Sequence, residues 1–129
     1  MSANVAQFSS AKYFSLETLR KTGAGVRTPV WFAEAPSSQV RATYYVYTLP
    51  DSGKMKRIRN NPAVRIAPCN MKGDVNGEWV EASARLCGDE EAATGQALLT
   101  DKYGLMKRIG DFFSRLRGRV QCVLAIEVS

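Results

Sequence analysis

The strongest chemical signal in the sequence is a basic segment that directly follows an aromatic one. The aromatic segment, 43–48, reads Thr-Tyr-Tyr-Val-Tyr-Thr, a pattern typical of a β-strand. In the basic segment, 51–62, Asp51 or Ser52 can cap a short helix that must end before Pro62. The segment carries four cationic side chains. Because free backbone N–H groups, a hydroxyl and basic side chains at a helix start favour anions, the segment predicts a phosphate site.

Helical geometry separates the four cations of this segment. At about 100° per residue, Met55 and Ile58 share one face, which we expect to enter the core. One phosphate cannot contact all four cations, and the residues alone support a solvated helix face as well as they support a phosphate site. The cations divide into a pair that flanks the core face, Lys54 and Arg59, and a pair that points away from it, Lys56 and Arg57.

Histidine is absent from the sequence, which removes the most common general base, metal ligand and catalytic-triad member. No two carboxylates have a spacing that singles them out as a catalytic pair, and no metal site is expected. If the protein is an enzyme, a bound cofactor therefore carries the chemistry, and the sequence assigns no catalytic residue. The formal net charge of +6 favours anionic partners.

The sequence as a whole predicts one domain, 1–129, built mainly from β-strands. Hydrophobic residues make up 45% and charged residues 23%, as in a typical globular protein. A helix that begins at Asp89 is expected to continue, with a bend or break at Gly104, to Leu116. The order strand–turn–strand with few helices favours an antiparallel barrel over a parallel sheet. Strands are expected over 13–21, 26–35, 40–49, 63–68, 78–86 and 119–128.

The cysteines Cys69, Cys87 and Cys122 are widely spaced and form no CxxC pair. They are interpreted as thiols in a reducing compartment rather than as a disulfide framework or a metal site. The sequence shows neither a signal-like start nor an apolar run of membrane-spanning length, so we expect a cytoplasmic protein without a membrane partner.

Four motifs, taken in their order, resemble a known family. They are 27–32 (RTPVWF), 47–48 (YT), 52–62 (SGKMKRIRNNP) and 67–69 (APC). Together they resemble the flavin and deazaflavin split-barrel proteins of the pyridoxamine-5'-phosphate-oxidase-like class. Within that class they look similar to the coenzyme F-420-dependent reductases. The resemblance extends over about residues 12–128.

This resemblance implies a six-stranded antiparallel split β-barrel, mainly β with accessory helices. It implies a homodimer with cofactor sites between the subunits, and coenzyme F-420 or FMN as the cofactor. The implied function is an oxidoreductase that transfers hydride to an unsaturated small molecule. The cofactor-binding residues that it implies are Arg27, Thr28, Pro29, Val30 and Trp31 beside the ring, Tyr47 and Thr48 at the end of a strand, and Ser52, Lys54, Lys56 and Arg57 at the phosphate.

Other interpretations stay open. An FMN enzyme would use the same phosphate site, and a carrier or sensor could bind the cofactor without turnover. Trp31 and the tyrosines could pack in a core instead of forming a ring wall. A nucleic-acid-binding module is less favoured, because no helix-turn-helix, zinc or RNA-recognition motif accompanies the second basic set. That set consists of Lys102, Lys107, Arg108, Arg115, Arg117 and Arg119.

Overall fold

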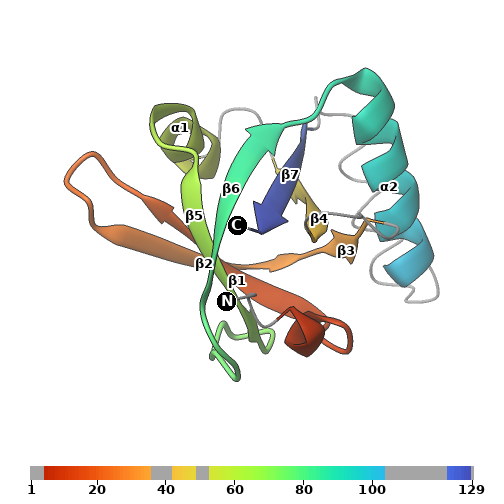
Figure 1. Ribbon diagram of the computed structural model, residues 1–129, viewed down its shortest axis with the longest axis horizontal. Coiled ribbons are helices and arrows are strands. Elements are labelled where there is room, and N and C mark those ends of the chain that lie inside the picture. Colours follow the sequence, from red (N-terminus) through yellow and green to blue (C-terminus); the bar gives the residue numbers. More distant parts are fainter. Residues whose placement is uncertain (1–4, 36–41, 49–52, 104–121, 129) are drawn as a thin grey trace.

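The computed structural model describes residues 5–35, 42–48, 53–103 and 122–128. Within them the chain forms one antiparallel β-sheet with two α-helices (Figure 1). The strands are hydrogen-bonded in the order β2-β1-β5-β6-β7-β4-β3. The predicted mainly-β fold with an antiparallel sheet is confirmed. The elements are a 3-10 helix η1 (Ala6–Phe8), β1 (Tyr13–Leu19), β2 (Gly25–Trp31), β3 (Ala33–Glu34), β4 (Thr43–Thr48), α1 (Gly53–Asn60), β5 (Ala63–Cys69), β6 (Val80–Leu86), α2 (Asp89–Tyr103) and β7 (Cys122–Val128).

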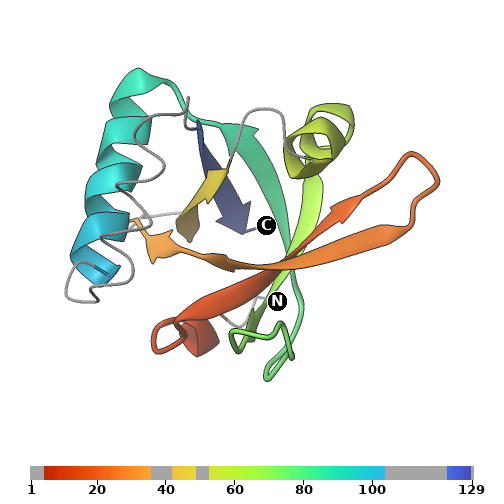
Figure 2. The same cartoon turned by 180° about the vertical axis from the view of Figure 1, so that it is seen from behind.

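The sheet curls on itself because its two outermost strands, β2 and β3, are consecutive in the chain. Phe32 alone joins them, yet β2 pairs with β1 and β3 pairs with β4 at the other end of the order. Figure 2 shows the curl from behind. The strand predicted for 26–35 is therefore divided, and the described part of the chain contains seven strands where six were predicted. At the division, the Phe32 ring stacks on Phe14 in the core, and its carbonyl oxygen accepts a hydrogen bond from Lys102 Nζ at 2.9 Å.

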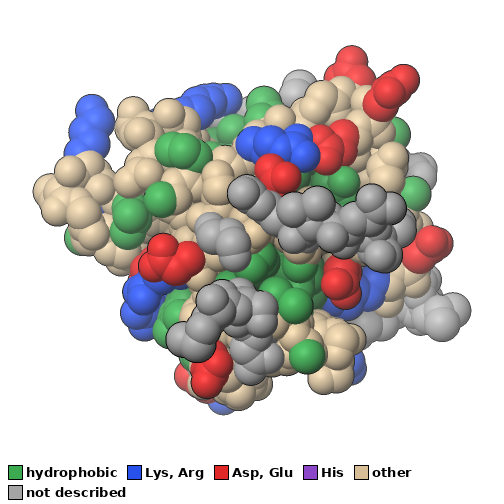
Figure 3. Space-filling view, viewed as in Figure 1, with side chains coloured by type: hydrophobic (Ala, Val, Ile, Leu, Met, Phe, Trp, Pro, Cys, Tyr) green, Lys and Arg blue, Asp and Glu red, His purple; other side chains and the backbone are tan. Residues whose placement is uncertain are grey.

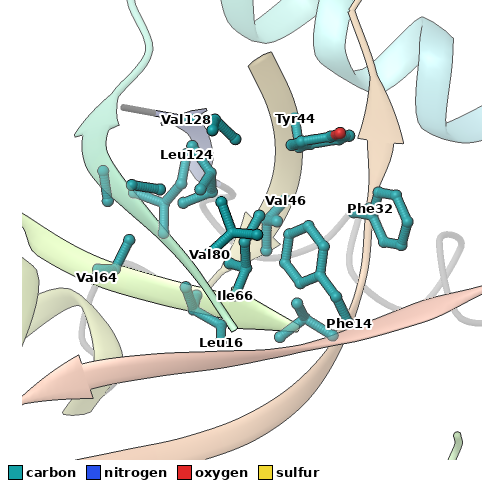
Figure 4. Packing of buried hydrophobic residues seen from close by; sticks show 14 of the residues in the cluster. Phe14, Leu16, Phe32, Tyr44, Val46, Val64, Ile66, Val80, Leu124 and Val128 are labelled. Atoms are coloured by element: carbon teal, nitrogen blue, oxygen red, sulfur yellow. The ribbon is translucent and has the colours of Figure 1, made fainter. Parts of the chain in front are cut away.

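The inside of the curl is filled by apolar side chains from the facing strands (Figure 4). Its aromatic part consists of Phe8, Phe14, Phe32 and Tyr44, whose ring centroids lie 4.4 to 6.2 Å apart. β6 alternates buried and exposed side chains over its first five residues, as predicted for a strand with one face on the core. Apolar burial is the main stabilising contribution to such a fold.

Helix α1 forms where it was predicted and ends before Pro62. Met55 and Ile58 are only 1% and 5% exposed, so the core face predicted from helical geometry is confirmed. The predicted direction of Arg57 is wrong. Its Nε donates a hydrogen bond to Thr18 Oγ1 of β1 at 2.6 Å, so the side chain points back to the sheet and ties the helix to it.

Helix α2 contacts β3, β4 and β7 along one side of the sheet (Figure 1). Gly95 permits this close approach, because a Cβ atom there would lie 2.8 Å from Val123 Cγ1. Arg85 of β6 strengthens the contact by forming ion pairs with Glu91 of α2 and Glu127 of β7.

Several expectations fall partly or wholly outside the described residues. The predicted helix over 105–116, the bend at Gly104 and the second basic set beyond Lys102 all lie there.

Cys69 and Cys87 carry free thiols, and Cys69 is buried. No helix in the described part of the chain has the length and apolar character needed to cross a bilayer.

Candidate functional site

A hollow of about 270 Å³ lies where β1, β2, β4 and the start of α1 come together. Five residues that the sequence assigned to cofactor binding line it: Pro29, Val30, Trp31, Tyr47 and Lys54. Two residues that the sequence did not assign complete the wall, Tyr13 and Met71.

Strand register explains how residues far apart in the sequence meet at this hollow. Tyr13 of β1 lies directly opposite Trp31 of β2, so both side chains stand on one face of the sheet. Pro29, two residues earlier in β2, stands on the same face. Tyr47 is the second-last residue of β4, and Lys54 is the second residue of α1.

Among the described residues that line this hollow, Lys54 is the only cation. Burial lowers the pKa of its ammonium below the ordinary value of 10.5, and the nearby Arg57 lowers it further. The structure places no carboxylate within ion-pair distance of Lys54 among the residues it describes. A half-buried cation at a helix start, with no carboxylate beside it among the described residues, provides a site for an anion.

The other lining side chains are aromatic or apolar. Trp31 and Tyr47 are half-buried and pack against Ala33 and Leu99. Burial raises the pKa of Tyr47, so its phenol is neutral at physiological pH. An apolar slot with one cation suits a flat ring compound that carries an anionic group.

Arg27, assigned to the ring region from the sequence, has a different set of contacts. Its Nε donates to Glu17 Oε2 at 2.8 Å, and its guanidinium lies 4.6 Å over the Trp79 ring. Arg65 binds the other Glu17 oxygen at 2.7 Å and also lies over Trp79. The Glu17 side chain is only 6% exposed. Burial raises the pKa of Glu17, but the hydrogen bonds and charges of the two arginines outweigh this and bring it below 4.5.

The other assigned residues that the structure describes do not line the hollow. Thr28 lies opposite Leu16 on the core face, and its buried Oγ1 has no hydrogen-bond partner among the described residues. Thr48 is buried at the end of β4, and Lys56 is exposed on α1. Ser52 lies outside the described residues. Arg57 is bound to Thr18.

Sequence reasoning missed three residues here for different reasons. Tyr13 could have been found, because strand pairing of 13–21 with 26–35 places it opposite Trp31. Glu17 could have been suspected as a carboxylate in the middle of an otherwise buried strand. Met71 lies in the loop between β5 and β6, where no periodicity shows which way a side chain points.

No protein-family model matches the sequence, and no curated protein matches it. Solved structures do match the fold. A protein from Listeria innocua, named as a candidate pyridoxamine 5'-phosphate oxidase, has 13% identity and a TM-score of 0.63 over 97% of this chain and 90% of its own. A coenzyme F-420 reductase has 15% identity and a TM-score of 0.57 over 100% and 95%.

A heme storage protein from Vibrio cholerae also matches, with 13% identity and a TM-score of 0.63 over 93% of this chain and 83% of its own. Identities this low establish the fold alone. These proteins share the curled antiparallel sheet with flanking helices that is described above. The chain therefore has the split-barrel fold of the pyridoxamine-5'-phosphate-oxidase-like proteins.

Proposed function

We propose that this protein is an oxidoreductase that binds coenzyme F-420 or FMN in the hollow around Lys54 and transfers hydride to an unsaturated small molecule. The observation that carries the proposal is the half-buried Lys54 ammonium, which lies near Arg57 and has no carboxylate beside it in the described part of the chain. A bound anion would offset the cost of burying this charge. Both cofactors combine a flat ring with a phosphate, which suits an apolar hollow with one cation.

The lining residues divide between the two ends of such a molecule. Lys54, with Ser52 and the first N–H groups of α1, would bind the phosphate. Trp31 and Tyr47 would flank the ring. The bound cofactor supplies the hydride chemistry, and the main contribution of the protein is to orient it. Arg27 and Arg57 hold structural positions in this proposal, because both already bind side chains of β1.

We further propose a homodimer in which a second copy covers this side of the sheet. Pro29 and Met71 are exposed and Trp31 is half-buried, which leaves an apolar area around the hollow. Such an area is a common basis for association of identical subunits. Sedimentation velocity at micromolar concentration, with cofactor present, tests this arrangement. A monomer under these conditions would contradict it.

A reducing compartment, and hence the cytoplasm, is the proposed location. The free thiols of Cys69 and Cys87 support it, since an oxidising compartment favours disulfides. Fractionation of cells that produce the full-length protein provides the test.

Titration of the purified apo protein with FMN and with coenzyme F-420 tests the main proposal. We expect one of the two to bind and to be retained with a visible absorbance. Hydride transfer is then measured as oxidation of the reduced, bound cofactor by a panel of quinones and nitro compounds. Failure of both cofactors to bind would refute the proposal, and binding without turnover would favour a non-catalytic cofactor carrier.

Two alternatives have less support from the described residues. Heme storage, as in the Vibrio cholerae protein, would need an iron ligand other than histidine, because the sequence contains none. Nucleic-acid binding is less supported because the basic side chain of Lys102 is engaged within the fold. Its ammonium donates a hydrogen bond to the Phe32 carbonyl oxygen and lies 3.5 Å from the centroid of the Phe32 ring. On the face shown in Figure 3, basic side chains are interspersed with acidic ones and form no continuous basic patch in its described part.

A further inference from the structure

Residues 70–79, which we call the β5–β6 loop, lie against β2, one of the strands that line the hollow. Gly73 has a φ of +94°, which favours glycine, and a Cβ atom there would lie 3.6 Å from Pro29 Cδ. Asn76 N donates to the carbonyl oxygen of Pro68 at 2.9 Å. At the end of the loop, Trp79 lies beneath the guanidinium groups of Arg27 and Arg65. The loop is thus held at both ends.

The first turn of the β5–β6 loop is braced by one side chain. Asn70 Oδ1 accepts hydrogen bonds from the backbone N–H groups of Lys72 and Asp74 at 2.9 and 3.0 Å. Asn70 Nδ2 donates to Asp74 Oδ2 at 3.1 Å, and the backbone N–H of Gly73 donates to Asn70 O at 3.0 Å. Because Met71 lies inside this turn, its backbone is held in one place.

Met71 is 68% exposed although it is a large apolar residue. It lines the hollow that contains Lys54, and together with Tyr13 it also lines a second hollow of about 470 Å³. The second hollow includes Lys12 and the amide side chains of Asn70 and Asn76. Met71 therefore stands at the boundary between an apolar hollow and a polar one, on a braced turn.

We propose that Met71 contacts the ring of the molecule bound in the apolar hollow and makes the hollow selective for flat aromatic rings. This inference rests on the proposed function of that hollow. A thioether is polarisable and makes favourable contacts with aromatic rings, and its three rotatable bonds let it follow a ring edge. Ligand binding would also remove exposed apolar surface of Met71 from water.

The test uses lumichrome, a neutral flavin-like ring without a side chain or phosphate, together with FMN. Dissociation constants are measured by calorimetry for the full chain. Met71→Ala should weaken lumichrome and FMN binding alike, by roughly two- to twelvefold, the factor that corresponds to a sulfur–aromatic contact. Met71→Leu should recover part of the loss. Leu86→Ala is the matched control, because Leu86 is 50% exposed and lines neither hollow, and it should leave both constants unchanged.

The outcomes separate this inference from the proposed function. If Met71→Ala binds lumichrome as tightly as the wild type, or if the wild type does not bind lumichrome, the role of Met71 is refuted. If neither FMN nor coenzyme F-420 binds, the proposed function fails. Lumichrome binding that depends on Met71 would then still support the ring contact. Lys54→Met should weaken FMN binding much more than lumichrome binding, which distinguishes the phosphate end of the hollow from the ring end.

Discussion

Replacing Lys54 by methionine removes the positive charge from the hollow and keeps most of the side-chain volume. In the proposed complex the ammonium makes a charge-assisted hydrogen bond to the cofactor phosphate. Losing such a bond costs roughly 1.5–3 kcal/mol, which corresponds to about a 10- to 150-fold weaker FMN affinity. Riboflavin, which has no phosphate, should bind both proteins equally well.

Lys56→Met is the matched control for this experiment. Lys56 lies two residues further along α1, is exposed, and changes the net charge by the same amount when it is replaced. We expect it to alter FMN affinity by less than about twofold at physiological salt, because exposed charges are screened. Lys54→Met should not lower the free energy of unfolding, since it removes a half-buried cation that has no carboxylate beside it in the described chain.

The pH dependence of binding gives an independent check. Burial, and then Arg57, lower the pKa of Lys54 below 10.5, so the free protein loses this proton at a lower pH than an ordinary lysine. A bound phosphate favours the charged form and raises that pKa. FMN affinity should therefore be highest below the Lys54 pKa and fall as the pH rises through it. A Lys54→Arg variant should keep its affinity over the same range.

Calorimetric titrations with FMN and riboflavin of the three variants, Lys54→Met, Lys56→Met and Lys54→Arg, test the proposed phosphate contact. The proposed phosphate contact of Lys54 fails if Lys54→Met binds FMN as tightly as the wild type. It also fails if Lys54→Met and Lys56→Met weaken binding equally, because the effect would then come from overall charge and not from a site.

Three predictions concern stability and are checked by urea denaturation. Glu17→Gln should lower the free energy of unfolding at pH 7 by about 1–3 kcal/mol, because Arg27 and Arg65 lose their shared carboxylate. Since the folded-state pKa of Glu17 is below 4.5, the wild type should lose this contribution as the pH falls below 4.5, and the variant should show a smaller acid effect. Tyr44→Phe should leave stability unchanged or raise it by up to about 1 kcal/mol, because the buried hydroxyl has no hydrogen-bond partner among the described residues; a clear loss would reveal one. Gly95→Ala should destabilise the protein by about 1–2 kcal/mol despite the better helix propensity of alanine, because its Cβ would meet side chains of β4 and β7; a more stable variant would contradict this close packing.

The sequence was sufficient for most of the described strands and for α1 because local pattern decides them. Alternation marks β6, and the positions of Met55 and Ile58 define the buried face of α1. The division at Phe32 could not be predicted, since 26–35 reads as one continuous strand. It depends on the ring stacking on Phe14 and on a hydrogen bond from Lys102, which is 70 residues away in the sequence.

Residues of the candidate site could be predicted where a sequence motif lies at the end of a strand or the start of a helix. They could not be predicted where a contact with a distant residue determines the position of the side chain. Lys54 and Trp31 were assigned from the sequence and line the same hollow. Arg27 was assigned with equal reason, but the sequence gives no sign that Glu17 would bind it, because that pairing depends on the register between β1 and β2. Met71 enters the wall through a loop turn that no periodicity describes.

In a chain with a net charge of +6, the number of cations cannot identify an anion site. The environment of each cation can. Arg27 and Arg85 bind carboxylates, and Arg57 binds a hydroxyl, so their charges already have partners within the fold. Burial also lowers the pKa of Lys102, to about 8, but its ammonium donates to a carbonyl oxygen and lies over a ring. Lys54 differs from these residues, because its burial lowers its pKa and no carboxylate among the described residues offsets the cost. A ligand that supplies a negative charge would offset this cost, and this is the physical reason for proposing a phosphate site at the start of α1.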